Sequence, residues 1–164
     1  MFEVGDKVVY PMHGAGIIEK IETKKILENE REYYIMKIPF GDMNVMIPVD
    51  NSENIGMRSV VSTETIDEVM LLLGSGVSDM PENWNKRYRE NVVKLKSGDI
   101  FSVAEVVRNL MVSERIKGLS TGERKMLLNA RQILISEMVL VRDINIEEAE
   151  YQIEQAVFGE AVKG

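Results

Sequence analysis

The chain has 164 residues, no cysteine, one histidine and a formal net charge of −7. Without cysteine it can form neither disulfides nor thiolate zinc sites, and no apolar run approaches the roughly 20 residues that span a bilayer. The first residues lack the basic and apolar stretches of a signal peptide, so we expect a cytoplasmic protein that does not bind membranes.

The charges are distributed unevenly along the chain. Residues 81–142 contain 12 basic and 7 acidic side chains, a net charge of +5. The other residues contain 8 basic and 20 acidic side chains, a net charge of −12. The total charge argues against nucleic-acid binding, which Lys and Arg drive, but the basic segment keeps that function open for one region.

Residues 1–61 have the pattern of a small β domain. Val, Ile and Tyr gather in short stretches that are separated by turn-type clusters. The connections are too short for crossover helices, so we expect antiparallel pairing in a closed or half-closed β-barrel of SH3 or Tudor type. Breaks in the alternation at residues 17–18 and 33–34 indicate bulges and bent strands. The expected strands are residues 7–10, 15–23, 32–38, 44–49 and a short fifth strand at 59–61.

From Ser62 onward the apolar period becomes helical, which predicts an all-helical domain over residues 62–164. One helix is expected over residues 64–73, and a flexible joint follows it near residues 74–79. A second helix should begin near Pro81, because proline is favoured in a first turn, and run to about Lys96. The protein is therefore expected to be α+β, a barrel followed by a bundle of four or five helices.

Capping boxes predict where the remaining helices begin. Gly118 and Gly159 stand where glycine commonly ends a helix. The three boxes are Ser102 with Glu105, Ser120 with Glu123, and Asn145 with Glu148.

Neither a catalytic nor a cofactor-binding motif is present. The only histidine, His13, lies in a tight turn, where a hydrogen-bonded turn residue is a better interpretation than a general base. The pair Gly14 and Gly16 lacks the third glycine and the following helix of a dinucleotide-binding loop. We therefore expect a protein that is not an enzyme and needs neither a metal nor a cofactor.

Residues 83–96 combine five basic residues with the only tryptophan, Trp84. In a helix, the apolar row would face the core and leave Lys86 and Arg89 outside. This exposed face is either simply solvated or contacts phosphates. Trp84, in the first turn, either packs on a neighbouring helix or stacks on, or wedges between, bases. The apolar row is Tyr88, Val92 and Leu95.

Two more cations belong to the basic segment. Arg124 and Lys125 fall in the first turn of a predicted helix, where the helix dipole disfavours positive charge. An anionic partner would explain their position.

Six motifs follow one another along nearly the whole chain. They begin at Val4, Asn83, Leu95, Val103, Gly118 and Ala130, and they read VGDxVVYPxHGxG, NWxxRY, LxSGD, VAEVVR, GLSxGE and ARQIL. This ordered set resembles the CarD/CdnL family of bacterial transcription regulators. The first motif alone is less specific, because transcription-repair coupling factors share a similar polymerase-binding module.

The resemblance implies a function for each domain. The Tudor-like domain would bind the β subunit of RNA polymerase. The helical domain would contact promoter DNA at the upstream edge of the transcription bubble, where a tryptophan wedges into the minor groove without reading sequence and helps to hold the open complex. The matching DNA-contacting candidates are Trp84, Lys86, Arg87, Arg89, Arg124 and Lys125.

Three residues match the polymerase-facing side of the N-terminal domain: Lys24, Ile26 and Met46. Met46 departs from the pattern, because actinobacterial relatives carry an arginine there. Either the contact is apolar in this protein, or the partner surface has changed with it.

The sequence thus favours a monomeric transcription regulator that bridges the β subunit and promoter DNA. The alternative is a protein–protein adaptor whose helical domain binds another protein and not DNA. Trp84 would then anchor that interface.

Overall fold

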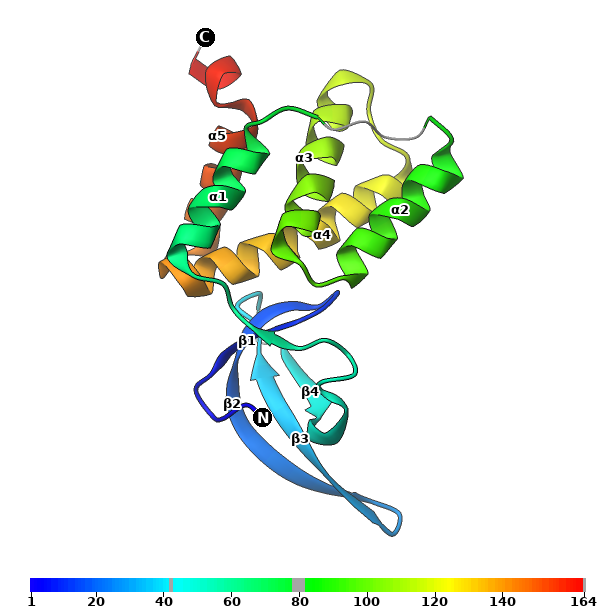
Figure 1. Ribbon diagram of the computed structural model, residues 1–164, viewed down its shortest axis with the longest axis vertical. Helices are drawn as coiled ribbons and strands as arrows, with labels where there is room; N and C mark the ends of the chain where they lie inside the picture. The colour runs from blue at the N-terminus through cyan, green and yellow to red at the C-terminus, as the bar shows by residue number, and fades with distance from the viewer. Residues whose placement is uncertain (42, 78–81, 164) are drawn as a thin grey trace.

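The computed structural model describes residues 1–41, 43–77 and 82–163, with residues 160–163 described by their backbone alone. A β-sheet forms one end of the molecule and the helices pack together at the other, so the chain is α+β as predicted (Figure 1). The last two predicted positions of the joint, 78 and 79, and the predicted helix start at Pro81 lie outside the described residues.

Among the described residues the sheet has five antiparallel strands in the order β4-β3-β2-β1-β5. They are β1 (Lys7–Tyr10), β2 (Gly14–Ile26), β3 (Asn29–Lys37), β4 (Asn44–Pro48) and β5 (Arg58–Ser59), with a 3-10 turn at Val49–Asn51 between the last two. The predicted antiparallel pairing is confirmed, but the sheet is not closed into a barrel. Over the described residues, two-residue β5 pairs with β1 and β4 pairs with β3, so each leaves one edge open.

Strands β2 and β3 form a hairpin that is longer than predicted and projects from the molecule (Figure 1). Its register shifts between Ile18 and Lys20, which confirms the bulge expected at residues 17–18. Pairing at Tyr33 and Tyr34 is regular, so the second expected bulge is absent there. Tyr34 is instead fully buried, and its hydroxyl accepts a hydrogen bond from the backbone of Phe2 at 3.0 Å.

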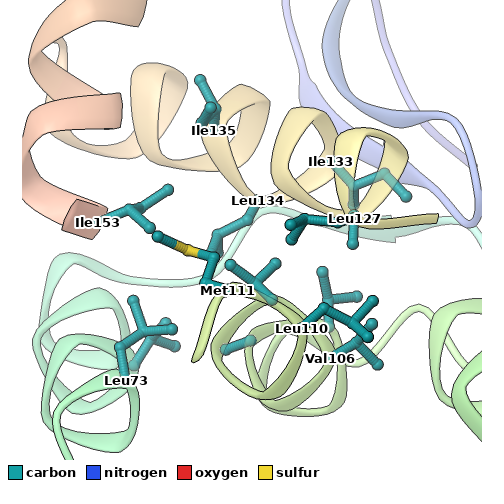
Figure 2. Packing of buried hydrophobic residues seen from close by; sticks show 14 of the residues in the cluster. Leu73, Val106, Leu110, Met111, Leu127, Ile133, Leu134, Ile135 and Ile153 are labelled. Atoms are coloured by element: carbon teal, nitrogen blue, oxygen red, sulfur yellow. The ribbon is translucent and has the colours of Figure 1, made fainter. Parts of the chain in front are cut away.

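In the described part of the chain five helices follow the sheet, at the positions that the apolar periodicity predicts. They are α1 (Thr63–Leu73), α2 (Trp84–Lys96), α3 (Ile100–Ile116), α4 (Thr121–Arg142) and α5 (Ile146–Lys163). Buried residues of α1 to α5 meet in one core, to which α2 contributes Leu95. Figure 2 shows Leu73, Leu110, Leu134 and Ile153, which come from α1, α3, α4 and α5. The sequence pattern thus located the helices and the faces that they bury.

The capping predictions were partly right. Ser120 and Asn145 cap α4 and α5, since their side chains accept hydrogen bonds from the backbones of Glu123 and Glu148. Ser102 was wrong as a cap, because Asp99 caps α3 one turn earlier and accepts from the Ser102 backbone instead. A carboxylate is at least as good a cap as a hydroxyl, and its negative charge also favours the helix dipole.

Of the two glycines predicted to end helices, one does so and the other does not. Gly118 follows α3 with φ +80°, as expected for a glycine after a helix. The predicted end at Gly159 is wrong, because α5 continues to Lys163. At the start of α2, the side chain of Asn83 caps the helix by accepting a hydrogen bond from the Lys86 backbone, and α2 begins at Trp84.

Helix α4 lies against β2 and joins the helices to the sheet. The hydroxyl of Ser136 accepts a hydrogen bond from the Ala15 backbone at 2.8 Å in a buried position. Beside it, a Cβ added to Gly14 would lie 2.8 Å from the Ser136 hydroxyl oxygen. A larger residue at position 14 would displace the Ser136 hydroxyl from this contact, and the φ of +111° is strained for any residue with a Cβ.

The junction also contains a buried ion pair. Arg58 donates to both carboxylate oxygens of Glu137, at 2.8 and 2.9 Å, and the backbone N–H of Val61 donates to Oε2 at 2.9 Å. Glu137 is 2% exposed. A buried carboxylate is tolerated only when its oxygens are paired in this way, so the ion pair depends on the sheet and the helices being correctly docked.

The variant Glu137→Ala should lower the free energy of unfolding by about 2–3 kcal/mol. It leaves the Val61 N–H without an acceptor, whereas the partly exposed Arg58 guanidinium can regain water, so the net loss is about that of one hydrogen bond to a charged group, about 1.5–3 kcal/mol. Urea denaturation followed by circular dichroism measures the change. The matched control Glu53→Ala, in an exposed loop, should stay within about 0.5 kcal/mol of wild type. If Glu137→Ala and Glu53→Ala unfold at the same urea concentration, the Arg58–Glu137 ion pair does not stabilise the junction.

Candidate functional site

Trp84 is the first residue of α2, and its indole rests on the first turn of α4. The indole Nε1 donates a hydrogen bond to the Ser120 hydroxyl at 3.2 Å. One ring face stacks on Tyr88, with centroids 5.1 Å apart and planes 18° from parallel. Trp84 is nevertheless 42% exposed, so it packs on a neighbouring helix and still presents a large aromatic surface.

Arg87 ties α2 to α4. Its Nε donates to Oε2 of Glu123 at 3.0 Å, and its Nη1 donates to the carbonyl of Glu82 at 3.2 Å. Glu123 is only 5% exposed. Although Arg87 was predicted to contact DNA, the structure places its guanidinium between two helices, where it balances a buried carboxylate.

The pKa of Glu123 is lowered from its ordinary value. Burial by itself raises the pKa, but the hydrogen bond and positive charge of Arg87, with further hydrogen bonds from Ser120, outweigh that effect. Glu123 is therefore ionised at neutral pH, and its carboxylate accepts hydrogen bonds from both Arg87 and the Ser120 hydroxyl.

Lys86 and Arg89 lie on the exposed side of α2, as predicted. Between them and Lys94, the side chain of Val93 is 67% exposed and lines a shallow apolar depression with these cations. Tyr88 and Val92 are half-buried and Leu95 is buried, which confirms the predicted inner row. At about 100° per residue, Lys86, Arg89 and Val93 lie about 140–180° around the α2 axis from Trp84. We call these four exposed residues of the helix the α2 surface.

Arg124 and Lys125 are both exposed, but only one lies on the side of α4 that faces Trp84. Gly122 faces the rings of Trp84 and Tyr88. At about 100° per residue, Lys125 lies about 60° from Gly122 around the helix axis, whereas Arg124 lies about 160° from it. Arg124 instead lines a separate groove with Glu114 and Arg131, so the structure does not bring it to the α2 surface.

Lys24, Ile26 and Met46 share one face of the hairpin end of the sheet. In the antiparallel register, Lys24 pairs with Arg31, and both Lys20 and Met46 pair with Ile35, so these side chains point to the same side. Ile26 is 61% exposed and Met46 is 46% exposed. We call Lys24, Ile26, Arg31 and Met46 the hairpin surface.

Sequence reasoning missed several residues of both surfaces. Arg31 and Tyr33 line a groove with Lys24 and Ile26, but only the strand register reveals their common face. Ser120 and Glu123 were recognised as a capping box, although nothing in their spacing indicated contact with Trp84 or Arg87.

His13 shows no arrangement for catalysis. Its ring stacks on Tyr10, with centroids 4.2 Å apart, and its Nδ1 lies 3.2 Å from the carbonyl oxygen of Pro11. Within the described residues, no group of three His, Asp or Glu side chains is placed to hold a metal ion. Nor does any helix of this part of the chain combine the length and apolar character needed to cross a membrane.

The fold and these two surfaces define a protein with an exposed β-hairpin at one end and an exposed aromatic and basic helix at the other. Comparison with known proteins identifies the protein family to which this chain belongs. The model of the CarD-like/TRCF RID domain matches residues 2–61, and the model of the CarD C-terminal domain matches residues 68–154. The chain belongs to the CarD-like family.

A curated relative supports the same assignment. The "Putative transcription factor YdeB" of Bacillus subtilis (strain 168) is 42% identical over 144 residues, which cover 88% of this chain and 94% of the relative. Family membership and this relative together indicate a regulator of transcription whose partner belongs to the transcription machinery.

The variant Glu123→Gln should reduce the acid sensitivity of folding. Because the folded-state pKa of Glu123 lies below its ordinary value of 4.5, its ionised form stabilises the protein above that pH. This contribution is lost as the pH falls through the folded-state pKa. Between about pH 5 and about pH 3, wild type should therefore lose more free energy of unfolding than Glu123→Gln, as measured by urea denaturation.

The exposed carboxylate of Glu90 on α2 provides the control. Glu90→Gln should retain the acid sensitivity of wild type. If Glu123→Gln also retains it, the Arg87–Glu123 pair does not stabilise the fold.

Proposed function

We propose that this protein binds the β subunit of RNA polymerase through the hairpin surface and contacts promoter DNA through the α2 surface. There it would stabilise the open complex at the upstream edge of the transcription bubble. The observation that carries the proposal is Trp84, a half-exposed indole held in place at the start of a basic helix. Under this proposal the protein acts in the cytoplasm as a monomer and is not an enzyme.

The α2 surface has the chemistry that a wedge into DNA requires. Lys86 and Arg89 offer positive charge to phosphates on the same helix that carries the indole, and Val93 adds apolar surface beside these two cations. Insertion costs a few kcal/mol of unstacking per step, and this cost is smallest where the duplex is already opening. The edge of a transcription bubble is such a place.

Contact with free DNA should be weak. Only a few cations lie near Trp84, Arg87 is engaged with Glu123, and the residues outside 81–142 carry −12. Attachment to polymerase would raise the effective DNA concentration, so weak contacts could still hold the melted state. The acidity of the protein thus favours DNA contact that depends on polymerase.

The hairpin surface has the chemistry of a protein interface. It combines two exposed apolar side chains, Ile26 and Met46, with the cations Lys24 and Arg31. Apolar centres with a polar rim are typical of specific protein contacts. Met46 supports an apolar contact at the position where relatives carry an arginine.

The variant Trp84→Ala should shorten the lifetime of the open complex at least about fivefold. About 1 kcal/mol is the lower end of the contribution of base–aromatic stacking, and it corresponds to a factor of about five. Competitor-challenged promoter complexes measure the lifetime, while binding to the isolated β subunit should not change. Leu71→Ala, which removes an exposed apolar side chain from α1, should leave the lifetime unchanged. A folded Trp84→Ala protein with the wild-type lifetime would exclude the wedge.

The variant Lys24→Glu should weaken binding to the β subunit about fivefold. Reversing a charge at the edge of an interface changes the affinity by about 1 kcal/mol. Lys25 gives a matched control, because it is also exposed but points to the opposite face of the hairpin. Titration calorimetry with Lys25→Glu should give the wild-type affinity. Equal affinities for both variants would remove Lys24 from the interface.

A photoreactive residue at position 84 separates DNA contact from the adaptor alternative. In a promoter–polymerase complex, label on DNA is the expected result. Label on protein alone would support an adaptor in which Trp84 anchors a protein interface.

A further inference from the structure

The side-chain hydroxyl of Ser120 uses all of its hydrogen-bonding capacity. It accepts one from the backbone of Glu123 at 3.2 Å, accepts another from Nε1 of Trp84 at 3.2 Å, and donates to Oε1 of Glu123 at 3.3 Å. A hydroxyl has one donor and two acceptor sites, so none is left over. The ionised Glu123 takes the hydroxyl hydrogen and leaves the oxygen lone pairs for the two N–H groups.

We propose that Ser120 is a positioning residue for Trp84. It holds the indole in one orientation and takes up its only hydrogen-bond donor, so the exposed part of the ring is carbon surface. The assignment rests on the proposed function, because it concerns the ring that would contact DNA. It adds to that function a residue on another helix and a constraint on what the indole can recognise.

The other neighbours of the indole restrict it further. Tyr88 covers one ring face, and Gly122 lies beside the Cζ2 corner, where an added Cβ would be 3.7 Å away. Glu123 is fixed by Arg87, with Nε 3.0 Å from Oε2. A chain of contacts therefore runs from Arg87 through Glu123 and Ser120 to the indole.

This arrangement limits recognition to stacking and apolar contact. The indole N–H is the only polar group of the ring, and it points to Ser120. It is not available to donate to an acceptor on a base edge, whereas every base offers a π-face to a stacking ring. The structure thus supplies a physical reason for an aromatic contact that does not discriminate between bases.

Trp84 is the only tryptophan, so its fluorescence reports the orientation of this ring directly. Ser120→Gly removes the hydroxyl but keeps a residue that helix N-caps tolerate well. With excitation at a wavelength that tyrosine does not absorb, the Trp84 fluorescence of this variant should show lower anisotropy and stronger acrylamide quenching than that of wild type. Ser120→Thr, which restores the hydroxyl and the cap, should recover both values.

Ser62→Gly controls for the loss of a serine cap. Ser62 caps α1 by accepting from the Thr65 backbone at 3.2 Å, and it belongs to a different helix from Trp84 and Ser120. The fluorescence anisotropy and acrylamide quenching of Ser62→Gly should match those of wild type. Wild-type anisotropy and quenching in Ser120→Gly would overturn the inference, as would equal changes in Ser62→Gly.

Open-complex lifetimes separate this inference from the proposed function. Ser120→Gly should give a lifetime between those of wild type and Trp84→Ala, with unchanged binding to the β subunit. If Trp84→Ala shortens the lifetime and Ser120→Gly does not, the positioning role is overturned and the wedge stands. If Trp84→Ala leaves the lifetime unchanged while the fluorescence of Ser120→Gly changes as expected, the wedge is excluded. The positioning of the indole by Ser120 is then still supported.

Discussion

Where the sheet meets the helices, the carboxylate of Glu137 accepts two hydrogen bonds from Arg58 and one from the backbone of Val61. Removing a carboxylate from water is unfavourable unless its oxygens are satisfied, and here the donors belong to Arg58 of β5 and to Val61, which follows that strand. The ion pair therefore exists only when the sheet is docked on α4. The neighbouring contact of Ser136 with the Ala15 backbone has the same requirement, and Gly14 allows the close approach.

Helix α4 also carries the second buried carboxylate, Glu123, which holds α2 through Arg87. The two glutamates are 14 residues apart, which is about 21 Å along a helix. One continuous helix thus connects the sheet, through Glu137, to the helix that presents Trp84. The hairpin and the start of α2 lie at opposite ends of the molecule (Figure 1). Both surfaces depend on α4 for their relative position, although neither hairpin nor indole belongs to it.

Patterns that depend on neighbours in the sequence predicted much of this structure. Apolar periodicity located the strands and helices, and local hydrogen-bonding patterns identified the caps at Ser120 and Asn145. Ser102 failed because Asp99, three residues earlier, competes for the same backbone groups. Contacts between distant segments had no such pattern. Arg58 and Glu137 are 79 residues apart, and Trp84 and Ser120 are 36 apart. Their meeting is decided by how α4 packs, and the same packing places Arg124 away from the side of α4 that faces Trp84.

The docking of the sheet on α4 restricts how the two surfaces can move relative to each other. The buried contacts at Glu137 and Ser136 would have to break before the hairpin surface could shift independently of the α2 surface. Under the proposed function, Trp84 would therefore lie at one fixed distance from the site where the protein attaches to polymerase.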